Sequence, residues 1–322
     1  MRVAFTEDQE ALRDVVRDLL QQHGDPEVVR AAWDAPQGQL DRTLWDRLVE
    51  LGLLQVLVPE SDGGLGMDLV SLVGPLEVSG RVALPHPLVE TAALGAPLLG
   101  ARLAEGPMVA ATWRGAVVPC GLDADLVLVV GERDIRLFEP GALELTPVQA
   151  VDGARRLARF GAPPSGGQVL TDDPAEVAAA FDRAALGTAA HLLGLCDAML
   201  QLTVDHVTER TQFGVPIGSF QAVKHHLADG LMRLSFARPA VHRAAYALAH
   251  GWEAASTEVS TAKVLAGEAA EAVGRSALQC HGAIGYTVEH DLLLFLKRSW
   301  ALTRSWGSPD WHTERVATAL EI

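Results

Sequence analysis

The sequence lacks several features that would assign it to a class of protein at once. Of its 322 residues only three are cysteines, Cys120, Cys196 and Cys280, and they are far apart and odd in number. This usage fits free thiols in a reducing compartment better than a disulfide framework. No apolar run approaches membrane-spanning length, and the first residues, MRVAFTEDQEALRD, contain no apolar signal region. The sequence therefore predicts a cytoplasmic protein.

Motifs for metal and phosphate are missing too. The glycine-rich SDGGLGM, residues 61–67, has no strand before it and no GK[ST] after it, so it is not a phosphate loop. His225, His226, His281 and His290 do not form an HExxH motif or pair with cysteines. Adjacent residues on a helix point different ways, so we interpret His225 and His226 as helix surface and bundle interior. We predict no metal site.

Charge and composition narrow the class further. The net charge of −15 argues against nucleic acid and anionic membranes as partners. An apolar content of 49% and a mean hydropathy of +0.17 are typical of a well-buried globular protein. A few local basic residues can still bind a phosphate-bearing ligand.

The pattern changes twice along the chain. Residues 1–107 show helical spacing, with Thr6 as an expected N-cap and LWDRLVELGLLQVLV, residues 44–58, as one helix closing on Pro59. Residues 108–174 contain short β-rich runs and end in an expected exposed linker, 161–174. Residues 175–322 contain four long helical patterns: Glu176–Glu209, Phe220–Gly251, Glu253–Cys280 and Glu289–Trp306. We predict a mostly α fold with a small β module and a C-terminal four-helix bundle.

The connection ERTQFGVPIGSFQ, residues 209–221, carries more chemistry than a turn requires. Arg210 would close a helix, where the dipole favours a cation, and its guanidinium could bind a diphosphate with paired hydrogen bonds. The alternative is an ordinary helix-terminal arginine with Phe213 as a buried plug. The loop by itself leaves both open.

Several segments together resemble one family. RTQFGVPIGSFQAVKHHLAD and LQCHGAIGYTVEHDL closely resemble the two signature segments of the acyl-CoA dehydrogenases, and FTEDQEALRDVVRDLL resembles their opening helical domain. The resemblance implies an N-terminal helical domain (1–107), a reduced middle β domain (108–174) and a C-terminal helical bundle (175–322) that contacts FAD and oligomerises. It also implies FAD-dependent α,β-dehydrogenation of an acyl-CoA thioester, with an electron-transfer flavoprotein or similar protein as electron acceptor.

The resemblance implies specific cofactor contacts. In the family, the matching residues contact the ADP half of FAD, largely on the flavin of a neighbouring subunit. In this sequence they are Arg210, Phe213, Gln221, Gln279 and Gly282. Ala283 replaces the usual second glycine of the last segment.

Two departures from the family pattern affect catalysis. The TEP…GSD-type segment that holds the flavin ring is absent, because the region reads ATWRGAVVPCGLDADLVLVV, residues 111–130. In the C-terminal base segment Trp306 takes the place of the catalytic glutamate. Asp182 is the one carboxylate at a known base position. Its alternative role is an exposed carboxylate at a helix N-terminus, paired with Arg183.

This asymmetry resembles the shortened partner subunits of heterotetrameric acyl-CoA dehydrogenases in actinobacterial steroid side-chain degradation, a branch of lipid metabolism. We therefore predict a subunit of a two-plus-two heterotetramer that completes the FAD site of a catalytic subunit. Two alternatives remain: a self-sufficient homo-oligomeric dehydrogenase with Asp182 as base, and a flavin-free scaffolding or binding protein. A steroid-like acyl group follows from the resemblance alone, and a polyketide or branched-chain thioester would look the same.

Overall fold

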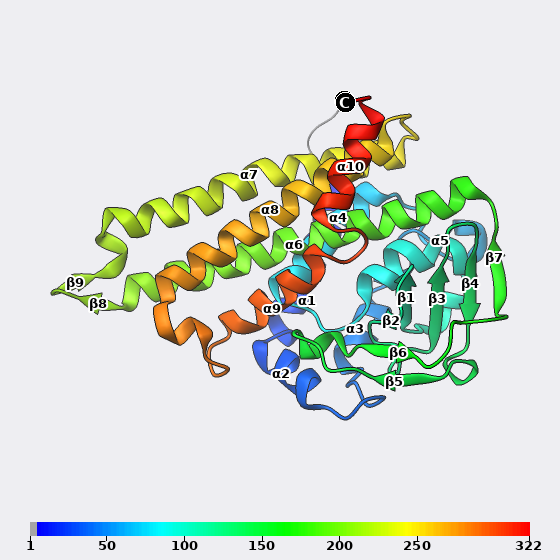
Figure 1. The fold of residues 1–322 in the computed structure, drawn as a ribbon, viewed down its shortest axis with the longest axis horizontal. Coiled ribbons are helices and arrows are strands. Elements are labelled where there is room, and N and C mark those ends of the chain that lie inside the picture. Colours follow the sequence, from blue (N-terminus) through cyan, green and yellow to red (C-terminus); the bar gives the residue numbers. More distant parts are fainter. Residues whose placement is uncertain (1–4) are drawn as a thin grey trace.

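The computed structural model describes residues 5–322, and helices dominate it (Figure 1). From Glu7 to Glu105 the structure is mostly helical and contains no strand, as predicted. Thr6 caps the first helix: its hydroxyl accepts from the Gln9 amide, and the Gln9 side chain accepts from the Thr6 amide. The helices of this region are α1 Glu7–His23, α2 Pro26–Asp34, α3 Thr43–Glu50, α4 Leu69–Arg81 and α5 Ala96–Leu99, joined by short 3₁₀ turns and by a π-helix, Val89–Gly95.

One predicted helix is divided. The sequence predicts a single helix over residues 44–58, but α3 ends at Glu50 and a 3₁₀ turn, Leu53–Gln55, follows. Gly52 lies between them with φ of 79°, a left-handed conformation that ends an α-helix and that glycine adopts without strain. Apolar spacing does not distinguish a helix from a helix and turn that bury the same face.

The strands of the middle segment lie between Val109 and Thr171 and form two small sheets. In the four-stranded sheet, of order β1-β3-β4-β7, β1 pairs parallel with β3, and the other pairs are antiparallel. The second sheet has the order β2-β6-β5. The strands are β1 Val109–Trp113, β2 Val117–Val118, β3 Leu126–Val130, β4 Ile135–Phe138, β5 Leu145–Pro147, β6 Ala158–Phe160 and β7 Gln168–Thr171. The expected linker 161–174 was therefore wrong in part, because it contributes the edge strand β7.

The C-terminal half contains three long helices that run side by side, followed by two shorter ones (Figure 1). A short hairpin of β8 Thr211–Gln212 and β9 Val215–Pro216 joins the first two. The fourth predicted helix is shorter than expected, and a fifth follows, capped by the Ser308 hydroxyl. The helices are α6 Pro174–Glu209, α7 Gln221–Ala249, α8 Ala255–His281, α9 Leu292–Thr303 and α10 Pro309–Ala319. The predicted class, mostly α with a small β module, is confirmed.

The longest helix, α6, lies in the centre of the core. By length and composition it could cross a membrane, contrary to the expectation that no apolar run is long enough. However, 78% of its apolar window is buried in the fold, which is typical of a core helix in a soluble protein. All three cysteines are free and buried, so the prediction of free thiols is confirmed.

The contact between α4 and α6 is made by two glycines. A Cβ on Gly194 would lie 1.9 Å from the Glu77 carbonyl oxygen, and a Cβ on Gly80 would lie 2.0 Å from that of His191. Both distances are far inside van der Waals contact, and both atoms met are backbone, which a rotamer change cannot move. The two helices therefore pack this closely only because neither residue has a side chain.

We expect Gly194→Ala to destabilise the protein by about 3 kcal/mol, because the added methyl group forces α4 and α6 apart. Gly141→Ala is the matched control, since a Cβ there has no neighbour within 4 Å. Urea unfolding of both variants measures the difference. Equal stabilities would show that this helix contact is not tight.

Candidate functional site

The predicted nucleotide-contact residues gather at one end of the helical bundle. Arg210 follows the last turn of α6, Gln221 begins α7, and Gln279 and Gly282 lie at the end of α8. The His206 and His281 rings stack 4.3 Å apart, which brings the ends of α6 and α8 together. All of the predicted contacts are exposed: Arg210, Phe213, Gln221, Gln279 and Gly282. This end of the bundle can therefore meet a ligand from outside.

Phe213 does not plug the core. Its side chain is 92% exposed at the tip of the β8–β9 hairpin, so the buried-plug alternative was wrong. Phe213 and Gly214 both have positive φ, 54° and 81°, which makes the tight turn that carries the ring outward. Its ring packs edge to face on Phe220, with centroids 6.2 Å apart, so the hairpin presents an exposed aromatic pair.

A cavity of about 420 Å³ joins the two segments that depart from the family pattern. One wall is the turn 304–308, which contains Trp306 at the expected base position. The other wall is β1 and the residues after it, where the flavin-ring segment would be expected. Trp113, Trp306 and Trp311 line the cavity, together with Arg114, Arg155 and Arg304. Folding thus places both departures in one site.

Hydrogen bonds from two buried side chains hold the turn that contains Trp306. Trp306 and Gly307 both have positive φ, 54° and 95°. The buried Lys263 ammonium donates to the carbonyl oxygens of Leu302 and Thr303, at 3.2 and 2.9 Å. His312 donates from Nε2 to the Trp306 carbonyl at 2.8 Å. These contacts fix a left-handed turn that a bulky residue would otherwise avoid.

Glu90 is a residue that the sequence analysis missed. It lies on the π-helix Val89–Gly95, is 9% exposed and lines the same cavity. Its one hydrogen bond within residues 5–322 comes from Trp306 Nε1, at 3.4 Å. The sequence signal that could have found it is slight: a single acidic residue in the otherwise apolar run LVETAALGAPLL. π-Helical turns occur often at functional sites.

Asp182 is not among the residues that line this cavity. It is 1% exposed, and its carboxylate accepts from Arg315 Nη1 at 2.5 Å and from Ser256 Oγ at 2.5 Å. The exposed alternative, paired with Arg183, was wrong, because Arg183 binds Glu176 instead. Both Asp182 oxygens are engaged in a buried ion pair. Its predicted role as a base stays untested.

The histidines are arranged differently from the expectation. His225 and His226 are both exposed, so neither lies in the bundle interior. His281 and His290 lie instead beside His206, from which 75 and 84 residues separate them along the chain. The prediction of no metal site was based on spacing along the sequence, and that spacing does not describe this cluster.

Comparisons with known proteins match nearly the whole chain to a single family. The N-terminal domain of the acyl-CoA dehydrogenases matches residues 6–100, and their C-terminal domain matches residues 175–321. The acyl-CoA dehydrogenase IpdE2 of Mycobacterium tuberculosis is 33% identical over 94% of this chain and 94% of its own length. The chain belongs to the acyl-CoA dehydrogenase family.

Solved structures show the same fold. A chain of the ChsE4–ChsE5 complex from M. tuberculosis superposes with a TM-score of 0.87 at 23% identity, over 100% of this chain and 99% of that one. A chain of the Tcur3481–Tcur3483 steroid ACAD G363A variant gives 0.85 at 24% identity, over 98% of both chains. The family that the sequence resembles is thereby confirmed, together with its fold.

The buried lysine under the Trp306 turn predicts a pH dependence. Burial, reinforced by Arg155, lowers the pKa of Lys263 to about 7, whereas an unfolded lysine titrates near 10.4. Between these values the unfolded state holds a proton that the folded state has lost, so the contribution of Lys263 to stability rises with pH. The unfolding free energy of the wild type minus that of Lys263→Met should therefore be larger at pH 9 than at pH 6.5. Urea titrations measure both, and an unchanged difference would contradict the assignment.

Asp182→Asn tests the ion pair. We expect a loss of about 2–3 kcal/mol, because Arg315 would keep a partly buried charge without its partner. Glu271→Gln is the matched control, since both partners of its pair with Arg275 are exposed and the pair should contribute less than about 1 kcal/mol. Thermal or urea unfolding distinguishes the two. Similar losses of unfolding free energy in the two variants would mean that burial does not increase the contribution of the Asp182 ion pair to stability.

Proposed function

We propose that this chain is the partner subunit of a heterotetrameric acyl-CoA dehydrogenase, which completes the FAD site of a separate catalytic subunit. The assembly oxidises an acyl-CoA thioester between its α and β carbons. The three free cysteines support a reducing, cytoplasmic location. FAD, when bound, takes up the hydride that leaves the β carbon.

Two observations carry this proposal: the distance between the two sites along α6, and Trp306 in place of the usual base. Phe181 packs against Trp306 at the cavity, with ring centroids 6.2 Å apart, and Glu209 precedes Arg210 at the opposite end of the helix. The 28 residues between them rise by about 42 Å. One FAD molecule does not span that separation within one chain. An FAD held at Arg210 therefore has its ring outside this chain's own cavity.

The exposed residues fit the ADP half of FAD. The Arg210 guanidinium can pair with a diphosphate through two parallel hydrogen bonds. The amides of Gln221 and Gln279 can donate to phosphate or ribose oxygens and accept from hydroxyl groups. Gly282 has φ of 65° and nothing within 4 Å of a built Cβ, so a ligand can approach its backbone closely.

An apolar surface surrounds these residues and supports a contact with another subunit. The side chains around the nucleotide end and along α7 are large, apolar and exposed: Phe213, Phe220, Leu231, Met232, Phe236, Ile284, Tyr286 and Val288. Patches of this kind on soluble proteins are typical of protein interfaces. The catalytic subunit would cover this surface and bring its flavin beside Arg210.

The chain's own cavity lacks the usual base. Trp306 cannot accept a proton, and its side chain is 7% exposed in a turn held by Lys263 and His312. A carboxylate that removes the α-proton must lie within about 2.6–3.2 Å of it. We infer that the catalytic subunit supplies this carboxylate.

The comparisons support a substrate class and an acceptor. One structure of the same fold is named a steroid ACAD, and another contains the electron transferring flavoprotein of Acidaminococcus fermentans. A bulky steroid-like acyl-CoA and an electron-transfer flavoprotein are therefore the proposed substrate and acceptor.

The position of Glu90 favours a second candidate function, that of a self-sufficient dehydrogenase. It lines the cavity and has one long hydrogen bond, whereas Asp182 is held in an ion pair. If this chain binds a flavin ring alone, Glu90 is a better candidate base than Asp182. Such an enzyme would lose dehydrogenation in Glu90→Gln.

Two measurements test the proposal: the flavin spectrum and the native mass. Both are made on the chain alone and on the chain co-expressed with a full-length acyl-CoA dehydrogenase encoded beside it. We expect a colourless single chain and a yellow mixed tetramer with one FAD per pair of chains. A single chain that is yellow, with one FAD per chain and dye-reducing activity, would overturn the proposal and favour the self-sufficient enzyme. A flavin-free mixed complex would support a scaffold instead.

Arg210→Ala in the mixed tetramer should weaken FAD binding about ten- to hundredfold, because a charge-assisted hydrogen bond contributes about 1.5–3 kcal/mol. Arg133→Ala, an exposed arginine in the β3–β4 turn, is the matched control and should bind FAD normally. Fluorimetric titration of flavin-stripped complexes measures both. Unchanged binding in Arg210→Ala would show that this chain contributes no diphosphate contact.

A further inference from the structure

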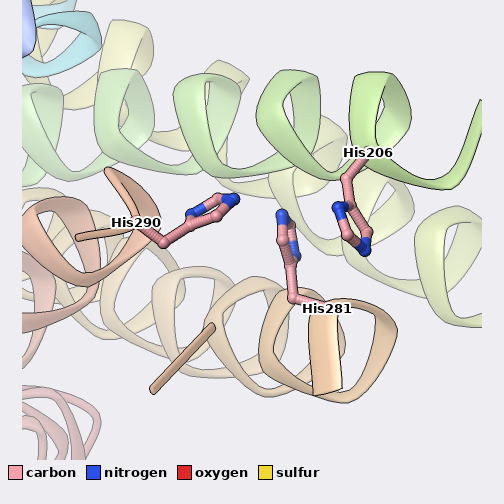
Figure 2. Close-up of side chains that lie close together, drawn as sticks. All are labelled: His206, His281 and His290. Carbon is pink, nitrogen blue, oxygen red and sulfur yellow. The ribbon is translucent and has the colours of Figure 1, made fainter. Parts of the chain in front are cut away.

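Three imidazoles from three separate elements meet at the nucleotide end of the bundle (Figure 2). His206 lies in the last turn of α6, His281 is the last residue of α8, and His290 lies in the turn before α9. Each offers a ring nitrogen, and these nitrogens all lie within 4.8 Å of one another. The His281 ring lies between the other two, 4.3 Å from the ring of His206 and 4.7 Å from that of His290.

His281 already has the arrangement of a metal ligand. Its Nδ1–H donates to the Ala277 carbonyl at 2.8 Å, so the lone pair of the neutral ring is on Nε2. Histidines that bind metals usually donate their other ring N–H to a carbonyl or carboxylate in this way. His281 is 6% exposed, and within residues 5–322 its buried Nε2 has no hydrogen-bond partner.

The other two histidines must adjust to bind the same ion. The His206 and His281 rings are within 20° of parallel, so their in-plane lone pairs do not converge. His206 is half-buried, so its ring must turn away from this stack to bind the ion. His290 accepts from the Leu292 amide through Nδ1, at 3.1 Å. Coordination through His290 Nε2 moves its proton to Nδ1 and gives up that one hydrogen bond.

We propose that His206, His281 and His290 bind one divalent first-row transition-metal ion through their ring nitrogens, with water completing the coordination. Imidazole suits zinc, copper and nickel, and three imidazoles leave a tetrahedral ion one open position. With Zn–N bonds of about 2.1 Å, nitrogens around a tetrahedral ion lie about 3.4 Å apart. The three nitrogens, now within 4.8 Å of one another, must therefore close in by about 1 Å when the ion binds.

The bound ion would tie together the ends of α6 and α8 and the turn before α9. Arg210 follows His206 by one helical turn, and Gly282 follows His281 directly. The ion would therefore hold in place the backbone segments that carry the proposed nucleotide contacts. This proposal does not depend on the proposed function, because the three histidines lie within one chain.

Zinc titration of the full-length chain, without a histidine tag and after treatment with a chelator, tests the site. A chromophoric chelator that competes for Zn²⁺ reports stoichiometry and affinity, and Co²⁺ in place of Zn²⁺ reports geometry by its visible absorption. We expect one ion per chain, intense tetrahedral Co²⁺ bands, and a melting temperature that rises with Zn²⁺.

His206→Phe is the test variant, because it keeps an aromatic ring against His281 and removes the nitrogen. We expect it to bind Zn²⁺ at least tenfold more weakly and to lose the Co²⁺ bands while remaining folded. The double variant His225→Gln with His226→Gln is the matched control, since it removes two exposed histidines elsewhere on the bundle and should bind Zn²⁺ normally.

Two results would overturn the proposal. One is a wild-type chain that takes up no more Zn²⁺ than His206→Phe does. The other is binding that survives in His206→Phe and disappears in the His225 and His226 variant, which would assign the ion to the surface of α7.

Discussion

The central position of α6 is the constraint on which the rest of the molecule depends. This helix is buried for most of its length, so every neighbouring element must approach it closely. The glycine contact with α4 shows how closely, since a single methyl group at Gly194 would overlap the Glu77 carbonyl. Alanine and glycine recur along α6 because larger side chains would hold α4 and α8 away from it.

The same helix separates the two chemical sites. At its start, Phe181 joins the aromatic side chains around the cavity, and at its end Arg210 enters the exposed hairpin. A rigid helix about 42 Å long between these points prevents a single cofactor from using both. The division of labour between unlike subunits that we propose is based on this geometry together with Trp306 in place of the base, since the distance alone also fits two copies of this chain.

The cavity and the nucleotide end also differ in how far they are preorganised. Lys263, His312 and Glu90 hold the Trp306 turn through buried hydrogen bonds, so the cavity has a fixed shape. Arg210, Gln221 and Gln279 are exposed, and they would lose side-chain freedom only when a ligand binds. A cavity of fixed shape and an exposed set of proposed nucleotide contacts suit a subunit that completes its partner's site.

The sequence by itself determined the family, the helical character of both ends and most of the strands between them, and it supplied the residues that we propose as nucleotide contacts. These features depend on local spacing and on contiguous motifs, both of which are visible in the sequence alone. Only the tertiary structure decided that Asp182 is buried against Arg315, that Phe213 is exposed, that Glu90 meets Trp306, and that three histidines far apart in sequence share one corner. All of these except the exposure of Phe213 are contacts between distant segments. Such contacts depend on how the helices cross α6, which no local pattern of residues specifies.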